Sequence, residues 1–239
     1  MSTRRMRGIV RKELREYRRN RSVVTGMAIL PLVFTIQPLI AILRFSTSSA
    51  GPLAHEHVLV FMLGIPALVP VVLASSAVAG ERAQGTLEPA LTTPLRREEM
   101  VLAKWLAALI PAVAIAYLVF GVFVAAVIAL AQPGVASAVF QWPDVLAQIV
   151  FTPLLASWSI WVGIAVSTRS SDVRVAQQLG TLASLPPVFA LVLVAVGVIP
   201  PTVELAVAAA AVLVILDVAG WRVTSVLFDR ERLITGTRT

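Results

Sequence analysis

Long apolar runs alternate with shorter polar segments along the chain. Six of these runs carry few charges over about twenty residues, the length that crosses a bilayer as a helix. They cover residues 22–43, 58–79, 105–131, 144–167, 173–199 and 203–221. Because a bilayer offers no water to backbone N–H and C=O groups, each run is expected to be helical. The pattern predicts an all-α integral membrane protein with six transmembrane helices.

Prolines interrupt several of the predicted spans. Pro38, Pro153 and the pair Pro186-Pro187 lack a backbone donor and predict kinks. A complete break at Pro186 would leave residues 173–185, which at about 1.5 Å per residue are too short to cross a bilayer. The fifth span is therefore expected to be one kinked helix.

Composition supports the membrane assignment. Hydrophobic residues make up 58% of the 239 residues, and the mean hydropathy is +0.86. Charged residues make up only 14%, against about 25% in a soluble domain. The chain has no cysteine, which excludes disulfides and thiolate metal sites.

Lysine and arginine are distributed unevenly between the predicted loops. Nineteen of the twenty lie in the tail 1–21, the loop 80–104, the link after the fourth run and the tail 222–239; only Arg44 lies on the opposite side. The positive-inside rule places both tails in the cytoplasm, on either side of a transmembrane domain over residues 22–221. The net charge of +7 is thus a topology signal, and no nucleic-acid partner is expected.

The basic N-terminal segment carries apolar residues at helical spacing, with arginines on the other face. The apolar residues are Met6, Ile9, Val10, Leu14 and Tyr17. This pattern predicts an amphipathic helix that lies on the inner leaflet. The alternative is a solvated basic tail that only sets topology. Cleavage as a signal peptide is not expected, because the apolar run that follows is longer than a signal-peptide core.

The loop 80–104 is a polar block between two apolar runs. Thr86 is expected to cap a short helix over residues 87–93, with Glu88 at the positive end of the helix dipole. Gly85 permits a sharp entry, and Pro94 ends the helix. A short helix fixed between two spans is well placed to transmit force, whereas the alternative is a surface loop whose breakers only make turns.

The motifs of this block resemble the signature of ABC-2 type transporter permeases, in particular their short, six-span, NatB-like members. The similar elements are Gly80-Glu81-Arg82, Gly85-Thr86-Leu87-Glu88, Thr93-Pro94, Glu98-Glu99 and Lys104, together with residues 11–15 before the first span and 228–233 in the tail. Two positions depart from the pattern. Pro89 replaces a helix-forming residue, and Ala103 replaces a frequent glycine.

The resemblance implies a prokaryotic plasma-membrane exporter subunit. The lack of a large outer domain and of a cluster of buried charge in the sequence favours a small amphiphilic or hydrophobic substrate, and the alternative suggested by the NatB-like members is an ion such as sodium. The resemblance also implies a dimer with itself or a second permease, and two ABC ATPase subunits that bind ATP and magnesium. The residues implied to couple to the ATPase are Glu81, Gly85, Thr86, Leu87, Glu88, Thr93 and Pro94. The chain itself has two lysines, neither of them in a GxxxxGK[ST] loop, so ATP hydrolysis must come from a partner.

A few polar residues within or near the spans are candidate pathway residues. They are Gln37, Gln148, Gln177 and Asp217. Intramembrane acids are functional by default, but Asp217 lies about one turn from the predicted cytoplasmic end, where an interfacial role is the alternative. The glutamines have the alternative of hydrogen bonding between helices.

Other chemistry is not predicted. The stretch His55-Glu56-His57 has no evident third strong ligand nearby, so no metal site is expected. An integral-membrane lipid-modifying enzyme is one alternative function, but the chain has no HExxH, no GxSxG and no close acid pair in a span. A non-transporting membrane anchor for a cytoplasmic partner is the other alternative.

Overall fold

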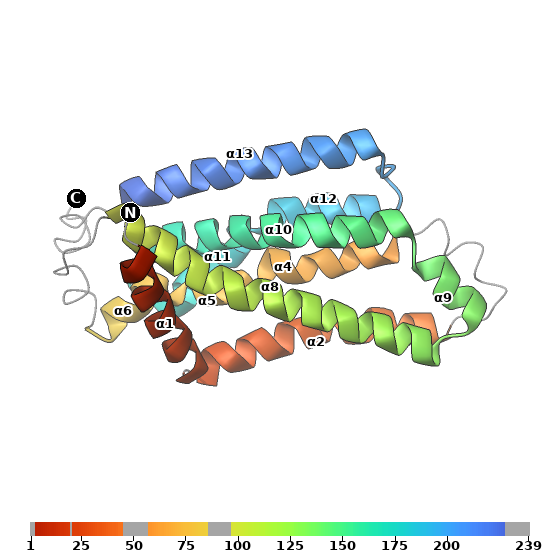
Figure 1. Cartoon of the computed structure of the whole chain (residues 1–239), viewed down its shortest axis with the longest axis horizontal. Coiled ribbons are helices and arrows are strands. Elements are labelled where there is room, and N and C mark those ends of the chain that lie inside the picture. The colour runs from red at the N-terminus through yellow and green to blue at the C-terminus, as the bar shows by residue number, and fades with distance from the viewer. Residues whose placement is uncertain (1–2, 20, 45–56, 86–96, 228–239) are drawn as a thin grey trace.

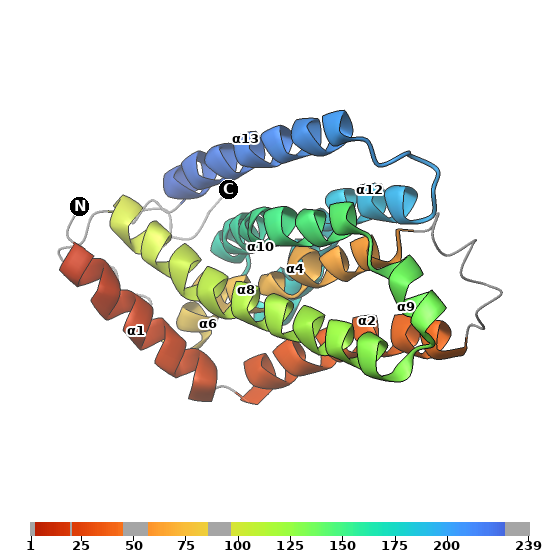
Figure 2. The same ribbon diagram turned by 45° about the vertical axis from the view of Figure 1, so that its right-hand side comes forward.

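The chain forms an elongated bundle of helices in a computed structural model that describes residues 3–19, 21–44, 57–85 and 97–227. Figures 1 and 2 show the long helices running along the bundle, with α1 (Thr3–Arg19) across one end and the short α9 (Pro133–Val139) at the other. We call these the α1 end and the α9 end. The C-terminal end of α13 also lies at the α1 end.

The described residues contain helices and no strand. After α1 these are α2 (Arg21–Arg44), η2 (Val58–Leu63), α4 (Gly64–Leu68), α5 (Pro70–Ala74), α6 (Ser76–Ala83), α8 (Arg97–Leu130), α9, α10 (Trp142–Arg169), α11 (Val173–Ala183), α12 (Leu185–Ala195) and α13 (Val203–Leu227). Five segments are long and apolar enough to cross a membrane, and α11 with α12 makes a sixth if the pair is one span. The predicted all-α membrane fold is confirmed.

The second span is a series of short helical pieces instead of one regular helix. It opens as a 3₁₀ helix and is then interrupted at Val69 and at Ser75. Pro70 has no N–H to donate to the carbonyl four residues earlier, which accounts for the first interruption. At the second, the Ser75 and Ser76 hydroxyls donate to the carbonyls of Val72 and Leu73, at 3.1 and 2.7 Å. Such back-bonding competes with the helical ladder.

The fifth span is broken, so the prediction of one continuous kinked helix is wrong. Helices α11 and α12 meet at Ser184 with a bend of 41°. The break precedes Pro186 and Pro187, which occupy the first turn of α12, where the missing N–H groups have no helical partner to lose. In Figure 1 the two halves follow one another along the length of the bundle, and α11 packs against α10 whereas α12 packs against η2 and α4.

Helix α9 has no counterpart among the predicted elements. Its seven residues fill the link between the third and fourth spans. Val135 and Val139 are buried in one cluster with Phe123 and Val127 of α8, which fixes α9 at the end of the bundle. A helix this short gives no span-length apolar run, and the sequence therefore did not indicate it.

Helix α10 is the centre of the bundle and packs against α4, α5, α6, α8, α11 and α13. Close approach to the second span requires a glycine. A Cβ on Gly163 would lie 2.5 Å from the Cβ of Ala74 and 3.4 Å from the Val71 side chain. A Cβ on Gly220 of α13 would lie 2.8 Å from Trp161 of α10. Small residues at helix contacts are the usual means of close packing in a membrane.

We expect Gly163→Ala to destabilise the protein by about 1–3 kcal/mol, because the added methyl group has no space beside Ala74. Gly121→Ala is the matched control, since a Cβ there meets no atom within 4 Å. The measurement is the thermal unfolding midpoint of each purified variant in detergent. Equal midpoints for the two variants would show that α5 and α10 do not pack this closely.

Candidate functional site

Helix α1 packs on the bundle through its apolar face. Val10 and Tyr17 are buried with Ala103 and Ala107 of α8, and Met6, Ile9 and Leu14 pack against the same cluster. The predicted amphipathic helix is confirmed. Its predicted apolar contact with the inner leaflet is corrected, because α8 covers much of that face.

The Lys104 ammonium group joins α1, α6 and α8 at this end of the bundle. Its Nζ lies 3.0 Å from Glu13 Oε1, 2.9 Å from Glu81 Oε1 and 2.8 Å from the Ala77 carbonyl oxygen. A lysine ammonium has three N–H donors, and here each has an acceptor. The Lys104 side chain is 2% exposed, and those of Glu13 and Glu81 are 5% and 8% exposed.

A second lysine balances the charges of this cluster. Lys12 Nζ lies 3.5 Å from Glu81 Oε1 and 3.4 Å from Glu16 Oε1. Its side chain is 49% exposed, so its ion pairs are screened by solvent and stabilise little. The Lys104 pairs are fully desolvated, and losing one partner would leave an uncompensated buried charge. We call Glu13, Glu81 and Lys104 the charge cluster.

The residue after Glu81 fixes the same helix to α10. Arg82 Nη1 donates to the Ser170 carbonyl at 2.6 Å, and Nη2 donates to the Thr168 carbonyl at 3.4 Å. These carbonyls stand at the C-terminal end of α10, where carbonyl groups lack helical partners and a cation is favourable. Glu81 and Arg82 therefore tie the end of the second span to α1, α8 and α10.

Ser167 of α10 caps the start of α6 from a neighbouring helix. Its hydroxyl accepts from the N–H groups of Val78 and Ala79, at 3.1 and 2.9 Å, and donates to the Ser75 carbonyl at 2.7 Å. The interruption at Ser75 leaves first-turn N–H groups without helical acceptors. Because Ser167 supplies an acceptor in the protein interior, the N–H groups that the break exposes at the start of α6 keep their hydrogen bonds.

Tyr17 lies beside the charge cluster. Burial raises the pKa of the Tyr17 phenol well above its ordinary value, and the carboxylates of Glu13, Glu81 and Glu16 raise that pKa further. The phenol oxygen is buried and has no hydrogen-bond partner within the described ranges. Tyr17 therefore stays neutral and contributes packing against α8.

The predicted coupling segment is bounded by these helices. Helix α6 ends at Ala83, and Gly85 has a φ of +66°, which confirms that it turns the chain sharply. Thr86, Leu87, Glu88, Thr93 and Pro94, together with the short helix expected over residues 87–93, lie outside the described residues. The described chain resumes at Arg97, in the first turn of α8. The charge cluster thus joins the helix before this segment to the helix after it.

Asp217 of α13 connects to α8 through α10. The Ser157 hydroxyl lies beside the Asp217 carboxylate and accepts from Trp105 Nε1 at 3.0 Å. Trp105 stacks on Trp161, with ring centroids 5.6 Å apart and planes at 6°. Helix α13 continues to Leu227, ten residues beyond Asp217, and carries Arg222 five residues beyond it. The Oδ1 atom of Asp217 is buried and has no hydrogen-bond partner among the described residues.

The structure does not gather the other predicted pathway residues around Asp217. Gln148 of α10 is 1% exposed and donates to Thr152 at 3.3 Å, four residues along the same helix. Gln177 lies partly buried on α11. Gln37 lies in α2, and its side chain is not among those described. No hydrogen bond between Gln148, Gln177 and Asp217 occurs in the described part, so a shared pathway stays a prediction.

At the α9 end, His57 pairs with Asp144. His57 Nδ1 lies 2.8 Å from Asp144 Oδ1, which joins the start of the second span to the start of α10. His55 and Glu56 lie outside the described residues. Within the described ranges, no group of three His, Cys, Asp or Glu side chains is placed to hold a metal ion.

The predicted site residues included Glu81 but not Lys104, Arg82, Glu13 or Ser167, although the first three of these stand within the family-like motifs. Glu13 had a signal, because it falls on the apolar face of α1 between Val10 and Tyr17 at helical spacing. A charge within an apolar face indicates a buried partner. No local sequence pattern indicated the role of Ser167. A serine near a helix end is common, and its role as an acceptor depends on a break in another span.

We expect Lys104→Met to lower the stability of the protein by about 3–5 kcal/mol, because it leaves Glu13 and Glu81 buried without a counter-charge. Lys12→Met is the matched control and should cost less than about 1 kcal/mol. Thermal unfolding in detergent compares the two, and protease cleavage in α1 reports its release from α8. Similar behaviour of the two variants would show that the charge cluster does not hold α1.

Comparison with known proteins agrees with this architecture. The sequence model of a family described as ABC-2 family transporter protein matches residues 7–215, a stretch that contains Glu13, Glu81 and Lys104. No curated protein matches the chain. The family match, the segments long enough to span a membrane and the helical bundle agree with one another. The chain therefore belongs to the ABC-2 transporter family and is a multi-pass membrane permease.

Proposed function

We propose that the chain is the membrane subunit of an ABC exporter that uses ATP hydrolysis by a separate ATPase subunit. Its energy comes from two copies of that ATPase, which bind ATP and magnesium, and it works with a second permease subunit in a prokaryotic plasma membrane. Both termini and the α1 end face the cytoplasm. The substrate is a small amphiphilic or hydrophobic compound moved outward.

One observation carries the proposal: the charge cluster links both sides of the segment 86–96. Glu81 lies four residues before Gly85, and Lys104 lies seven residues after Arg97. Their ion pair at 2.9 Å is buried, and Arg82 adds contacts to α10 at 2.6 and 3.4 Å. An ATPase that displaces this segment would therefore move α6 and α8 together, with α1 and α10 attached. The segment is the coupling element, and Thr86, Leu87, Glu88, Thr93 and Pro94 form its contact surface.

Asp217 is the residue that we assign to the substrate pathway. It is a partly buried carboxyl group in a membrane-spanning helix, and one of its oxygens is unpartnered among the described residues. Polar groups at this depth are costly and mark pathways or relays. Lys104 and Trp105 are consecutive on α8, so movement of the charge cluster reaches Ser157 and Asp217 through the Trp105 hydrogen bond at 3.0 Å.

We expect Glu88→Arg to abolish stimulation of the ABC ATPase encoded beside this chain, and to reduce its co-purification by at least tenfold. The substitution reverses charge at the predicted N-terminus of the coupling helix. Glu204→Arg makes the same charge change in the first turn of α13, at the α9 end, and should leave both readouts unchanged. The measurements are a pull-down and ATP turnover in lipid. If Glu88→Arg leaves ATPase binding unchanged, the segment 86–96 is not the coupling element and only connects α6 to α8.

Because the chain has no cysteine, single cysteines can report water access to the proposed pathway. We expect Asp217→Cys to react with a water-soluble maleimide at a rate that changes at least threefold when ATP is added to the assembled complex. Val212→Cys is the control, because Val212 is 54% exposed on the same helix and is expected to contact lipid instead of water. No labelling of Asp217→Cys in any nucleotide state would remove it from the pathway and favour a non-transporting anchor.

A further inference from the structure

Helix α1 carries a row of arginines that the charge cluster does not use. Arg7, Arg11, Arg15 and Arg18 line one groove together with Val10 and Leu14. Their spacing of four, four and three residues places their Cα atoms along one side of the helix, from which the side chains extend in different directions. The twelve residues from Arg7 to Arg18 extend about 16 Å along the helix axis.

The arginines of this row have no counter-charge in the described part of the protein. The lysine of α1 pairs with Glu81 and Glu16, and Glu13 pairs with Lys104. Both acids of α1 are therefore already engaged. No ion pair joins any of the four arginines to a described residue, and all four are exposed. Four exposed guanidinium groups without a counter-charge among the described residues create a local attraction for anions.

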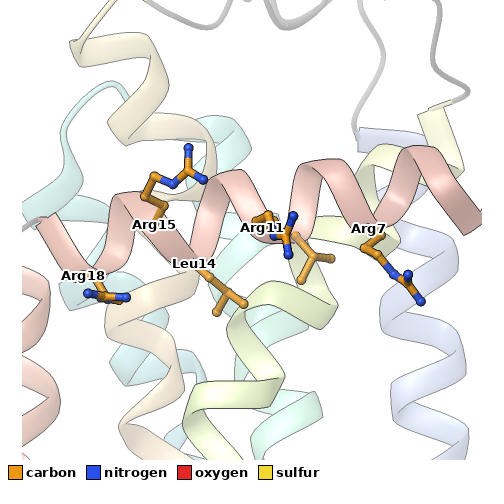
Figure 3. A pocket seen from close by; sticks show the side chains of 6 residues that line it. Arg7, Arg11, Leu14, Arg15 and Arg18 are labelled. Atoms are coloured by element: carbon orange, nitrogen blue, oxygen red, sulfur yellow. The ribbon is translucent and has the colours of Figure 1, made fainter.

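The groove opens beside the spanning helices. Figure 3 shows Arg7, Leu14 and Arg18 on the side of α1 from which the spanning helices extend, and Arg15 on the opposite side. Val10 and Leu14 also belong to the apolar contact between α1 and α8. The groove thus combines an apolar floor with guanidinium groups at the level where the spans leave the bilayer.

We propose that this groove binds the phosphate groups of anionic phospholipids in the leaflet next to α1. A guanidinium group presents paired N–H donors that match two phosphate oxygens. The partly exposed Leu14 side chain beside the guanidinium groups accommodates the glycerol end of the acyl chains, which a free phosphate or a nucleic acid lacks. Bound anionic lipid then holds α1 through its arginines, while the ion pair between Lys104 and Glu13 holds α1 against α8.

The inference goes beyond the transport proposal and depends only on the chain lying in a membrane. It is tested on the whole protein in a neutral detergent, titrated with phosphatidylglycerol or phosphatidylcholine, with native mass spectrometry as the measure of retained lipid. We expect the unmodified protein to retain phosphatidylglycerol in preference to phosphatidylcholine. Raising the salt concentration should weaken this preference, since the attraction is between exposed charges.

Arg11→Gln combined with Arg18→Gln is expected to weaken phosphatidylglycerol binding about 25-fold, at about fivefold for each basic residue near the membrane surface. Arg169→Gln combined with Arg174→Gln is the matched control. It removes the same charge from exposed positions at the same end of the bundle but outside the groove, where solvent screens the attraction for the bound lipid, so binding should change by less than about twofold. The single variants at Arg11 and Arg18, each expected to lose about fivefold, extend the test if the double variant does not fold.

Three results would overturn the proposal. The first is equal retention of the two lipids by the unmodified protein. The second is a double variant at Arg11 and Arg18 that binds phosphatidylglycerol as tightly as the control pair does. The third is displacement of phosphatidylglycerol by inorganic phosphate at an equal concentration, which would assign the arginine row to a soluble anion. Failure of transport or of ATPase coupling leaves these outcomes unchanged, so the two proposals fail separately.

Discussion

The buried ammonium group of Lys104 is the interaction on which the arrangement of the α1 end depends. Removing a lysine and two glutamates from water costs several kcal/mol for each ion, and this cost is recovered only if every donor has a well-placed acceptor. Lys104 meets that condition with Glu13, Glu81 and the Ala77 carbonyl at 2.8–3.0 Å. Since the three acceptors come from two other helices, the condition is met in one arrangement of α1, α6 and α8 only.

The second span is mechanically unusual because its backbone is interrupted twice within the membrane-spanning length. An interrupted helix in lipid is tolerated when neighbouring groups satisfy the freed backbone atoms. Ser167 does this at the break near Ser75, and Arg82 returns a contact to the end of α10. The span is thereby held at its α1 end by α10, in addition to the Glu81 ion pairs with α1 and α8, while its prolines and breaks leave several points at which it can bend.

The intramembrane carboxyl group and the charge cluster are connected through one helix. Lys104 and Trp105 are neighbours in α8, but their side chains reach different partners: Lys104 contacts α1 and α6, and Trp105 contacts Ser157 and Trp161 of α10. Displacement of α8 along or across the bundle therefore changes both sets of contacts together. This gives a physical route between the segment 86–96 and Asp217 without a separate signalling element.

The sequence by itself determined the membrane fold, the number of apolar segments, the amphipathic helix α1 and the turn at Gly85, because hydropathy, helical periodicity and glycine conformation are local properties. It also indicated the family through the motifs around Glu81 and Lys104. Only the tertiary structure decided that Lys104 pairs with Glu13 and Glu81, that Ser167 caps α6, and that α1 packs on α8. Those contacts join residues up to 92 positions apart, and no local pattern specifies which distant carboxylate or hydroxyl group satisfies a buried donor.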